Sequence, residues 1–383
     1  MENNVFVIGG NHHNTLGVIR SLGTVGISPY LLLSSKDESP YVALSKYIKE
    51  KWIFKSDLEI ISFLVSYPCE RNSVLISCSD TLAYLVDTNY EVLSSKYRIP
   101  GCPQQGQLAF YMNKEVMSNV ARKVGFSVPD TVVFDSKNVN SDITLPFPWI
   151  IKPLVSCEGK KSDIKRCYDR KEWEEYKNSM HCERIQIQQL IDKEFEFQLI
   201  GCSIKGGEEL IIPGYAKNIR PSDVSNTGFL QYIPTSDLPI DMSVCKAFVK
   251  QTGYSGLFSM EFIHGQDGNN YFMEINFRND GNSICVTYSG MNLPYIWVLS
   301  QLDLSYETEL NKVCNMRRIY VMPEFDDLIL LLKRKVNFFI WIRDFLRTDY
   351  FMEFSHSDTK PFFRALYNFV KRGVRYCWKK IMK

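Results

Sequence analysis

Residues 257–277, LFSMEFIHGQDGNNYFMEINF, constrain the fold most strongly, because they read as two strands joined by a tight turn. Asp267-Gly268 is a strong signal for a two-residue hairpin loop. A loop that is symmetric about these two residues places Glu261 directly opposite Glu274. Like charges that face each other across a sheet destabilise it. This pairing therefore predicts either a bound cation or a solvated surface.

The second strand carries polar side chains at every second position, namely Glu274, Asn276 and Arg278. Successive side chains of a strand point to opposite faces, so a carboxylate, an amide and a guanidinium share one face. Two carboxylates and an amide oxygen form an all-oxygen set that suits Mg²⁺, with Mn²⁺ as an alternative ion. Two exposed acids on a wet sheet are the other interpretation, which the apolar residues of FSMEF and FMEINF disfavour.

The first hundred residues alternate short apolar runs with helical patterns. VFVIGG (5–10), PYLLL (29–33) and VLISCSD (74–80) read as buried strands. Strands separated by helical segments predict βαβ units and a parallel sheet. The loop GGNHHNTLG after the first strand lies where open α/β sheets bind ligands, but it lacks the G-x-G-x-x-G spacing of a dinucleotide site.

The middle of the chain contains strands, helices and two polar segments. A helical pattern at 112–129 is followed by FPWIIKP (147–153), the polar loop LVSCEGKKSD (154–163) and the strands RIQIQQLI (184–191) and KEFEFQLIG (193–201). Residues 205–235 form a long polar segment that we expect to be irregular. It contains Lys217, Arg220, Ser225, Asn226 and Thr227, which makes it the place to look for a substrate site.

The 383 residues exceed what one hydrophobic core usually supports and predict two or three domains. The net charge of +2 gives no signature of a nucleic-acid-binding protein. The 11 cysteines include no C-x-x-C pair, which argues against a zinc ribbon or a disulfide framework and favours a reducing, cytoplasmic setting. The chain has no long uninterrupted apolar run, so no membrane-spanning helix is predicted.

Together, these motifs resemble those of the ATP-grasp superfamily of carboxylate–amine and carboxylate–thiol ligases. They occur in family order: an α/β domain, Lys114 before a G-x-x-x-P segment, a strand ending in Lys152-Pro153, a polar loop, a hinge strand and the hairpin ending in MEINFR. The resemblance covers roughly residues 1–300. It is strongest to the D-aspartate ligase-like branch found in bacterial surface-polymer biosynthesis, including surface polysaccharide.

The resemblance implies a mixed α/β and α+β fold in three parts. Residues 1–103 would form a Rossmann-like pre-ATP-grasp domain. Residues 104–315 would form the ATP-grasp domain, with a small lobe at about 114–190 and a large lobe at about 191–315. Residues 316–383 would form a basic, helical extension.

The resemblance also implies roles for individual residues. Lys114 and Lys152 match lysines that contact the nucleotide phosphates, and Arg278 matches an arginine that contacts phosphate or the carboxylate under attack. The metal ligands would be Glu261, Glu274 and Asn276. The adenine would lie beside Gln188, Gln189, Leu190 and Ile191, and the ribose would bind Glu194 or Glu196. Simpler alternatives are a surface lysine for Lys114, an ion pair separating the acids for Arg278, and solvent-facing acids for Glu194 and Glu196.

Two positions depart from the family pattern. The loop at 154–163 contains a single glycine, Gly159, with Ser156, Lys160 and Lys161 nearby, whereas bare backbone amides usually cradle the phosphates. Phe277 stands where the motif usually has proline. Neither change alters the ligand set of the hairpin.

The function implied is ATP-dependent activation of a small carboxylate as an acyl phosphate and its transfer to an amine, with release of ADP and phosphate. Arg220, together with Lys217, is predicted to hold a carboxylate, since a guanidinium binds carboxylates bidentately. The alternatives are a ligase that makes a thioester or ester, and a non-catalytic relative that binds a nucleotide or sugar acid. A homodimer is a further expectation.

The C-terminal region has a charge pattern of its own. After Asp358 the chain contains no acid but eight cations: Lys360, Arg364, Lys371, Arg372, Arg375, Lys379, Lys380 and Lys383. Apolar residues recur at helical spacing from Phe362 to Cys377. A basic amphipathic helix of this kind either lies on an anionic membrane surface or packs its apolar stripe on the protein body.

Overall fold

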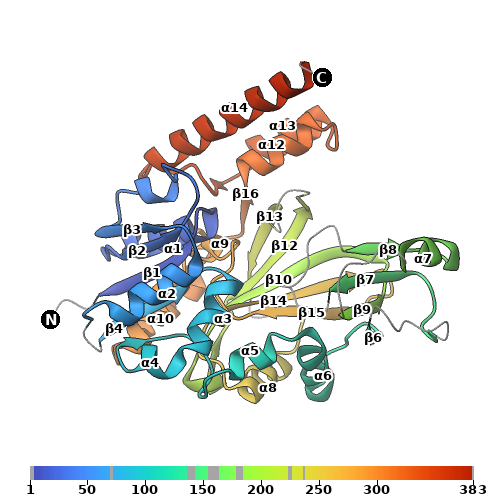
Figure 1. The fold of residues 1–383 in the computed structure, drawn as a ribbon, viewed down its shortest axis with the longest axis horizontal. Helices are drawn as coiled ribbons and strands as arrows, with labels where there is room; N and C mark the ends of the chain where they lie inside the picture. Colours follow the sequence, from blue (N-terminus) through green and yellow to red (C-terminus); the bar gives the residue numbers. More distant parts are fainter. Residues whose placement is uncertain are drawn as a thin grey trace.

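The computed structural model describes residues 4–69, 72–135, 143–153, 164–177, 184–222, 227–235 and 238–381. Within these residues the strands form three sheets (Figure 1). The N-terminal sheet is parallel, the small sheet is antiparallel, and the large sheet is antiparallel except where β16 pairs with β17. This arrangement confirms the predicted mixed α/β class.

The N-terminal sheet has the strand order β3-β2-β1-β4-β5. Its strands are β1 (Val5–Gly10), β2 (Tyr30–Ser34), β3 (Glu50–Phe54), β4 (Ser73–Ser77) and β5 (Tyr97–Arg98), and its helices are α1 (His13–Thr24), α2 (Asp57–Ser66), α3 (Asp80–Thr88) and α4 (Tyr90–Ser94). The parallel register confirms the βαβ prediction. The sequence pattern does not predict β3, because three of its five residues are exposed and its apolar alternation is weak.

The large sheet has the order β15-β14-β10-β12-β13-β16-β17, and β11 adds to β10. Its strands are β10 (Lys193–Ile204), β11 (Glu209–Ile211), β12 (Gly214–Arg220), β13 (Phe229–Pro234), β14 (Gly256–Gly265), β15 (Asn270–Asn276), β16 (Ile319–Met322) and β17 (Tyr350–Phe351). Three of them lie in the polar segment at 205–235, so the prediction of an irregular segment is wrong for its described residues. Pairing with β10 overrides the weak strand propensity of these residues.

Glu261 lies opposite Glu274, as predicted, although the turn differs from the one expected. The residue pairs nearest the turn are centred on Asp267 alone, not on Asp267 and Gly268 together. The Gly265 N–H donates to the Asn269 carbonyl at 2.9 Å, and Gly268 adopts a positive φ of 79°. A bulge between Phe262 and Glu261 then shifts the register by one residue. Without this bulge Met273 would face Glu261, so the bulge creates the acid pair.

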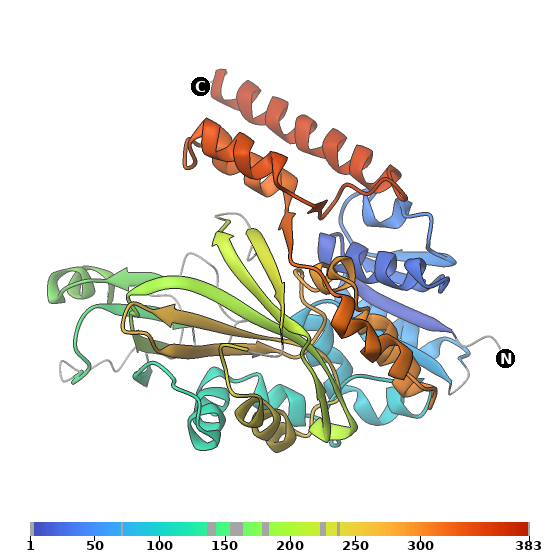
Figure 2. The ribbon, with the colours of Figure 1, turned by 180° about the vertical axis from the view of Figure 1, so that it is seen from behind.

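The small sheet forms a separate lobe with its own core. Its order is β6-β9-β7-β8, with β6 (Thr131–Asp135), β7 (Trp149–Pro153), β8 (Lys165–Cys167) and β9 (Arg184–Gln189), and α7 (Arg170–Lys177) belongs to it. Trp149, Ile151, Trp173, Ile185 and Ile187 fill its core. Figures 1 and 2 place this lobe at the far end of the long strands of the large sheet.

The small lobe begins later in the chain than predicted. The helix α6 (Lys114–Val124) does not join the small sheet but packs on β15 and on α8 (Met242–Thr252). Its Met117 and Ala121 share a core cluster with Phe262 and Phe272 of the large sheet. The boundary near residue 114 therefore shifts to β6, because the apolar face of α6 is buried against the large sheet.

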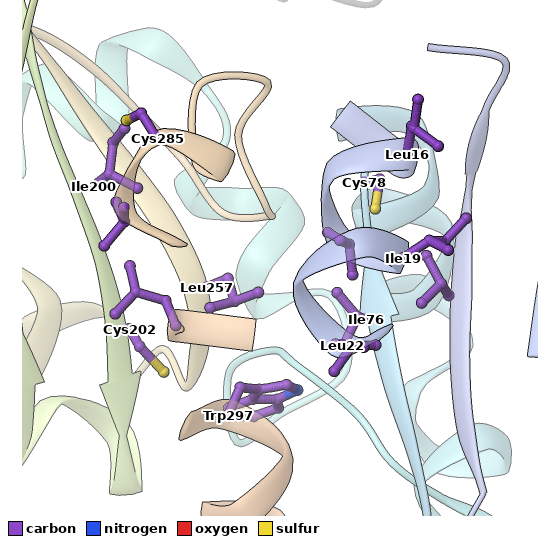
Figure 3. Packing of buried hydrophobic residues seen from close by; sticks show 14 of the residues in the cluster. Leu16, Ile19, Leu22, Ile76, Cys78, Ile200, Cys202, Leu257, Cys285 and Trp297 are labelled. Carbon is purple, nitrogen blue, oxygen red and sulfur yellow. The ribbon is translucent and has the colours of Figure 1, made fainter. Parts of the chain in front are cut away.

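The N-terminal domain and the large sheet share one core. Figure 3 shows Leu16, Ile19 and Leu22 of α1 facing Ile200 and Cys202 of β10, with Leu257 and Trp297 between them. The indole N–H of Trp297 donates to the Leu75 carbonyl at 3.2 Å. Three short helices complete this layer: α9 (Ile284–Ser289), α10 (Leu293–Gln301) and α11 (Glu307–Leu310). Because the core is continuous, the two domains are expected to move as one body.

The C-terminal region starts as part of the large sheet and ends in helices. Beyond β16 it contains α12 (Glu324–Leu332), α13 (Phe338–Leu346) and α14 (Lys360–Ile381), which lie together at one end of the molecule (Figures 1 and 2). Phe362 and Phe369 of α14 stack on Phe325 of α12. Part of the predicted apolar stripe is therefore packed on the protein. In the described part of the chain, no helix combines the length and apolar character needed to cross a membrane.

Candidate active site between the two lobes

A cleft of about 1030 Å³ lies between the small lobe and the large sheet. Nine of the residues predicted for the site line it: Lys114, Lys152, Gln188, Gln189, Leu190, Ile191, Glu196, Glu261 and Glu274. They come from α6, β7, β9, the connection after β9, β10, β14 and β15. Residues far apart in sequence thus meet because the two sheets face each other.

The acid pair lies on the floor of this cleft. Burial and, after it, the charge of Glu274 together raise the pKa of the Glu261 carboxyl to about 8. Glu261 accepts hydrogen bonds from Asn276 Nδ2 at 2.9 Å and from Gln198 Nε2 at 3.1 Å. The Lys114 ammonium lies 3.9 Å from Glu274 Oε2. A buried carboxylate and a half-buried one, facing each other with one lysine nearby, favour a bound cation.

Asn276 is oriented differently from a metal ligand. Its amide oxygen accepts from Arg278 Nη2 at 3.2 Å, while its amide nitrogen faces Glu261. Rotation of this amide is needed before its oxygen can join the two carboxylates. Within the described residues, no group of three or more His, Cys, Asp and Glu side chains is arranged to hold a metal. The two acids fit Mg²⁺ when phosphate oxygens and water supply the remaining ligands, as is usual for this ion.

Two lysines face the acids and make the other half of the site cationic. Lys152 Nζ donates to Gln188 Oε1 at 3.1 Å. Burial and, after it, the nearby charge of Lys114 together lower the pKa of Lys152 to about 8. Two ammonium groups held together in this way favour an anion between them. The simpler interpretation of Lys114 as a surface lysine does not fit a side chain that is 19% exposed and lines the cleft.

The ribose prediction named two acids, and only one of them lines the cleft. A bulge in β10 interrupts the pairing with β14 between Lys193 and Phe195, which breaks the alternation that would put Glu194 and Glu196 on one face. Glu196 points into the cleft and lies 2.6 Å from Lys193 Nζ. Glu194 is 54% exposed and lies 3.8 Å from His264. The structure therefore favours Glu196.

The two cations predicted to hold the carboxylate substrate lie elsewhere. Lys217 faces Phe197 in the register, and its ammonium lies 3.6 Å from the ring centre of Phe195, on the face opposite the cleft. Arg220 donates to Asp327 and Asp344 at 2.8–2.9 Å and so ties β12 to the C-terminal helices. The prediction is wrong for both, because strand alternation turns one away and ion pairing engages the other.

Some predicted residues fall on parts of the chain outside the description. The loop at 154–163, with Ser156, Gly159, Lys160 and Lys161, and the residues Ser225 and Asn226 lie outside the described residues. Their predicted roles stay predictions. Thr227 is described, and its hydroxyl lies 3.1 Å from His13 Nε2.

Arg278 connects the cleft floor to the N-terminal domain. Its guanidinium donates to Asp80 at 3.1 and 3.2 Å and to Asp280 at 2.8 Å, and these acids raise its pKa. Asp80 is the first residue of α3, the helix that follows β4, and its position is fixed by the N-cap Ser79, whose hydroxyl accepts from the Leu82 N–H. The predicted ion pair with the metal acids is not formed. Arg278 is instead positioned between two further acids beside the cleft.

Among the cleft residues that the sequence does not predict are Gln198, Asn218 and Asn282. Gln198 lies directly between Glu261 and Ala216 in the sheet register. Asn282 continues the every-second-residue row of polar side chains beyond the end of β15. That row is the one sequence signal that pointed to it.

Comparison with known proteins agrees with this geometry at the level of the fold. No family model and no curated protein matches the chain. A solved structure of an L-amino acid ligase from Bacillus licheniformis matches with a TM-score of 0.62 and 15% identity, covering 83% of this chain and 78% of the other. The chain has the ATP-grasp fold. This mixed fold, with an N-terminal α/β domain and a helical C-terminal region, is as predicted.

Two further structures extend the ATP-grasp comparison. An N5-carboxyaminoimidazole synthetase from Staphylococcus aureus matches with a TM-score of 0.61 and 14% identity, covering 80% of this chain and 78% of the other. The biotin carboxylase domain dimer of a 2-oxoglutarate carboxylase from Hydrogenobacter thermophilus, in complex with MgADP, ADP and bicarbonate, matches with a TM-score of 0.59 and 14% identity, covering 78% and 69%. At these identities the ATP-grasp likeness concerns architecture.

Proposed function

We propose that the chain is an ATP-dependent ligase that activates a small carboxylate as an acyl phosphate and transfers it to an amine. One observation carries this proposal: a pair of opposed acids and a pair of lysines line one cleft. The acids, Glu261 and Glu274, suit a metal-bound polyphosphate, and the lysines, Lys114 and Lys152, suit its anionic oxygens.

The reaction has two balanced steps. A carboxylate oxygen forms a bond to the γ-phosphorus of ATP, the bond to the β–γ bridging oxygen breaks, and ADP leaves with that electron pair. The amine nitrogen then bonds to the carbonyl carbon, the carbon–oxygen bond to the phosphoryl group breaks, and phosphate leaves with the pair and takes up the nitrogen's proton. The products are an amide, ADP and inorganic phosphate.

The position of each residue in the cleft suggests its role in the reaction. Lys114 and Lys152 stabilise the charge on the transferred phosphoryl group, as cations do in phosphoryl transfer. Arg278 lies beside the acid pair and contacts the carboxylate or its phosphoryl group. Mg²⁺, or Mn²⁺ in its place, would bind Glu261, Glu274 and a rotated Asn276, and would neutralise phosphate charge. The adenine lies beside Gln188, Gln189, Leu190 and Ile191, with Glu196 on the ribose.

The proposed substrate class is that of small carboxylates. The L-amino acid ligase and the bicarbonate complex among the similar structures both fit a small carboxylate. We place the chain in the D-aspartate ligase-like branch that serves bacterial surface polymers. Formation of a thioester or ester is the catalytic alternative. A non-catalytic protein that binds a nucleotide or sugar acid is the other, and the buried acids and lysines argue against it.

The proposal predicts the products of the reaction. Purified protein with Mg²⁺ and ATP should release ADP and phosphate only when a suitable carboxylate and amine are both present. A coupled assay over a panel of amino acids and sugar acids measures this release. AMP and pyrophosphate as products would contradict the acyl phosphate route, and ADP release independent of both substrates would contradict the ligase assignment.

A second part of the proposal keeps the membrane contact predicted for the basic C-terminal helix α14, but moves it to the exposed surface formed by α12 and α13, because Phe362 and Phe369 of α14 pack on Phe325. Leu332, Phe338, Phe339 and Leu346 are 67%, 56%, 79% and 77% exposed. Lys333, Arg334 and Lys335 follow Leu332, and Arg343 lies on α13. Apolar side chains flanked by cations fit an anionic lipid surface. We include peripheral membrane contact, at the inner face of a cytoplasmic membrane, in the proposal on this charge complementarity.

Replacing Phe338 and Phe339 together by aspartate should lower binding to phosphatidylglycerol vesicles at least about tenfold, since each inserted aromatic side chain contributes on the order of 1.5–3 kcal/mol. Co-sedimentation measures the change, with phosphatidylcholine vesicles for comparison. Phe110→Asp is the control, because Phe110 is 59% exposed on α5 (Gln107–Tyr111), outside this surface. Equal vesicle binding by the aspartate variant and the unaltered chain would contradict membrane contact. If the unaltered chain is a homodimer and the aspartate variant a monomer with equal vesicle binding, the surface is an interface with a second copy.

A further inference from the structure

Two amide oxygens in the cleft are buried and lack a hydrogen-bond donor among the described residues. They are Oδ1 of Asn218, on β12, and Oδ1 of Asn282, just before α9. Both side chains line the cleft, and Asn282 is only 6% exposed. Buried polar atoms are nearly always paired in native proteins. An acceptor that is buried and lines a ligand cleft is therefore expected to pair with a donor on the ligand.

The orientation of the Asn282 amide is fixed by a chain of hydrogen bonds that starts at the acid pair. Glu261, when ionised, can only accept, so Gln198 must turn its Nε2 towards Glu261, at 3.1 Å. Gln198 Oε1 then faces Asn282, whose Nδ2 donates to it at 2.7 Å. The remaining atom, Asn282 Oδ1, is left as an acceptor. The carboxylate that binds the metal thus determines which group Asn282 presents.

The backbone around both asparagines is tightly constrained. The Asn282 N–H donates to Asp280 Oδ1 at 2.8 Å, which fixes the turn after Arg278. A Cβ added at Gly228 would lie 2.8 Å from Asn218 Oδ1, and one added at Gly281 would lie 3.0 Å from Thr227 Oγ1. The pair Thr227-Gly228 thus lies between the two asparagines, on one side of the cleft. The site is held in shape by close packing and does not depend on the free rotation of either side chain.

We infer that Asn218 and Asn282 form the subsite for the attacking amine, with their side-chain oxygens accepting its N–H groups. This inference rests on the proposed ligase function and deepens it by placing the acceptor. The Gln198 relay positions Asn282 relative to Glu261, and hence relative to the phosphoryl group that leaves when the nitrogen bonds to the carbonyl carbon. The proton lost from nitrogen leaves with the inorganic phosphate.

Neutral amide oxygens suit this task better than carboxylates would. A carboxylate beside the amine would favour its ammonium form, which has no lone pair for attack. An amide oxygen orients the N–H groups without adding a charge. The two lysines that line the cleft, Lys114 and Lys152, disfavour a further positive charge beside them and so favour the free amine. Together, the amide oxygens and the nearby lysines thus favour the uncharged, nucleophilic amine over its ammonium form.

The test separates the two half-reactions. Hydroxylamine at high concentration traps an acyl phosphate as a hydroxamate and so reports activation of the carboxylate without the natural acceptor. With the carboxylate and amine that give the highest ADP release, Asn282→Ala should raise the KM for the amine at least about tenfold. Asn282→Ala should also lower kcat/KM for the amine and the rate of hydroxamate formation by different factors. The factor for hydroxamate formation should be at least about ten times smaller. Asn218→Ala should act in the same direction.

Controls and contrary outcomes are defined by the same assay. Asn315→Ala, at an exposed position of the 3₁₀ turn Asn311–Asn315, should behave as the unaltered chain. Asn282→Asp keeps an acceptor oxygen at the site and should bind the amine more tightly than Asn282→Ala does. An unchanged KM for the amine, or equal loss of hydroxamate and amide, would overturn the inference. An acceptor that reacts only through a hydroxyl or thiol would also overturn it, whereas absence of both hydroxamate and ADP would overturn the ligase proposal itself.

Discussion

Replacing Glu274 by glutamine is expected to lower kcat on the order of 10³-fold while the fold is retained. Glu274 supplies one of the two charges that hold the metal over the phosphates. Its side chain is 29% exposed, and the ion pair that the structure gives it is a contact of 3.9 Å with Lys114. Loss of the charge also relieves the repulsion on Glu261. We therefore expect the Tm to stay the same or to rise as activity is lost.

The matched control is Glu208→Gln, which removes an equivalent charge at an exposed position near β11. Steady-state ADP release and thermal unfolding are measured on both variants. Activity close to that of the unaltered chain in Glu274→Gln would refute the metal assignment. A large drop in Tm would show that Glu274 serves the fold instead.

Replacing Arg20 by methionine is expected to lower the free energy of unfolding by about 3–5 kcal/mol, the usual cost of leaving a buried charge unpaired. Arg20 is 3% exposed on α1 and contacts the C-terminal region, donating to Asp358 Oδ2 and to the carbonyls of Met352, Glu353 and Asp358 at 2.8–3.2 Å. Asp358 is itself 2% exposed. These bonds join the first helix to the segment before α14.

Urea unfolding measures this change, with Arg318→Met as the control because Arg318 is exposed. Adding Asp358→Asn to Arg20→Met should recover part of the lost stability, since it removes the unpaired charge. A loss below about 1 kcal/mol in the single variant would place this contact in the class of weak surface ion pairs.

The parts of the fold that the sequence predicts are those governed by local periodicity. Buried parallel strands show as continuous apolar runs, which is why β1, β2 and β4 are predicted. The hairpin of β14 and β15 is predicted from its turn residues and alternation. The acid pair is predicted because its surroundings are too apolar for charges without a role, whereas Lys114 and Lys152 are predicted from the resemblance of their motifs.

The parts that the sequence does not predict depend on contacts between distant segments. The bulge that brings Glu274 opposite Glu261 leaves no mark in the alternation of β15, and the bulge at Glu194 turns one acid out of the cleft. Polar strands such as β12 form because β10 offers a pairing edge, and the alternation of β12 turns Lys217 away from the cleft. The orientation of the Asn282 side chain depends on its hydrogen bond to Gln198, which lies 84 residues earlier in the chain.

The central claim is that the carboxylate is activated as an acyl phosphate in the cleft between Lys152 and the acid pair. The most direct measurement uses a carboxylate substrate labelled with ¹⁸O in both oxygen atoms, together with unlabelled ATP and the amine. Mass spectrometry of the released phosphate then follows the oxygen. The account predicts that one labelled oxygen appears in inorganic phosphate and the other stays in the amide. Phosphate without label, or label in AMP, would contradict the account.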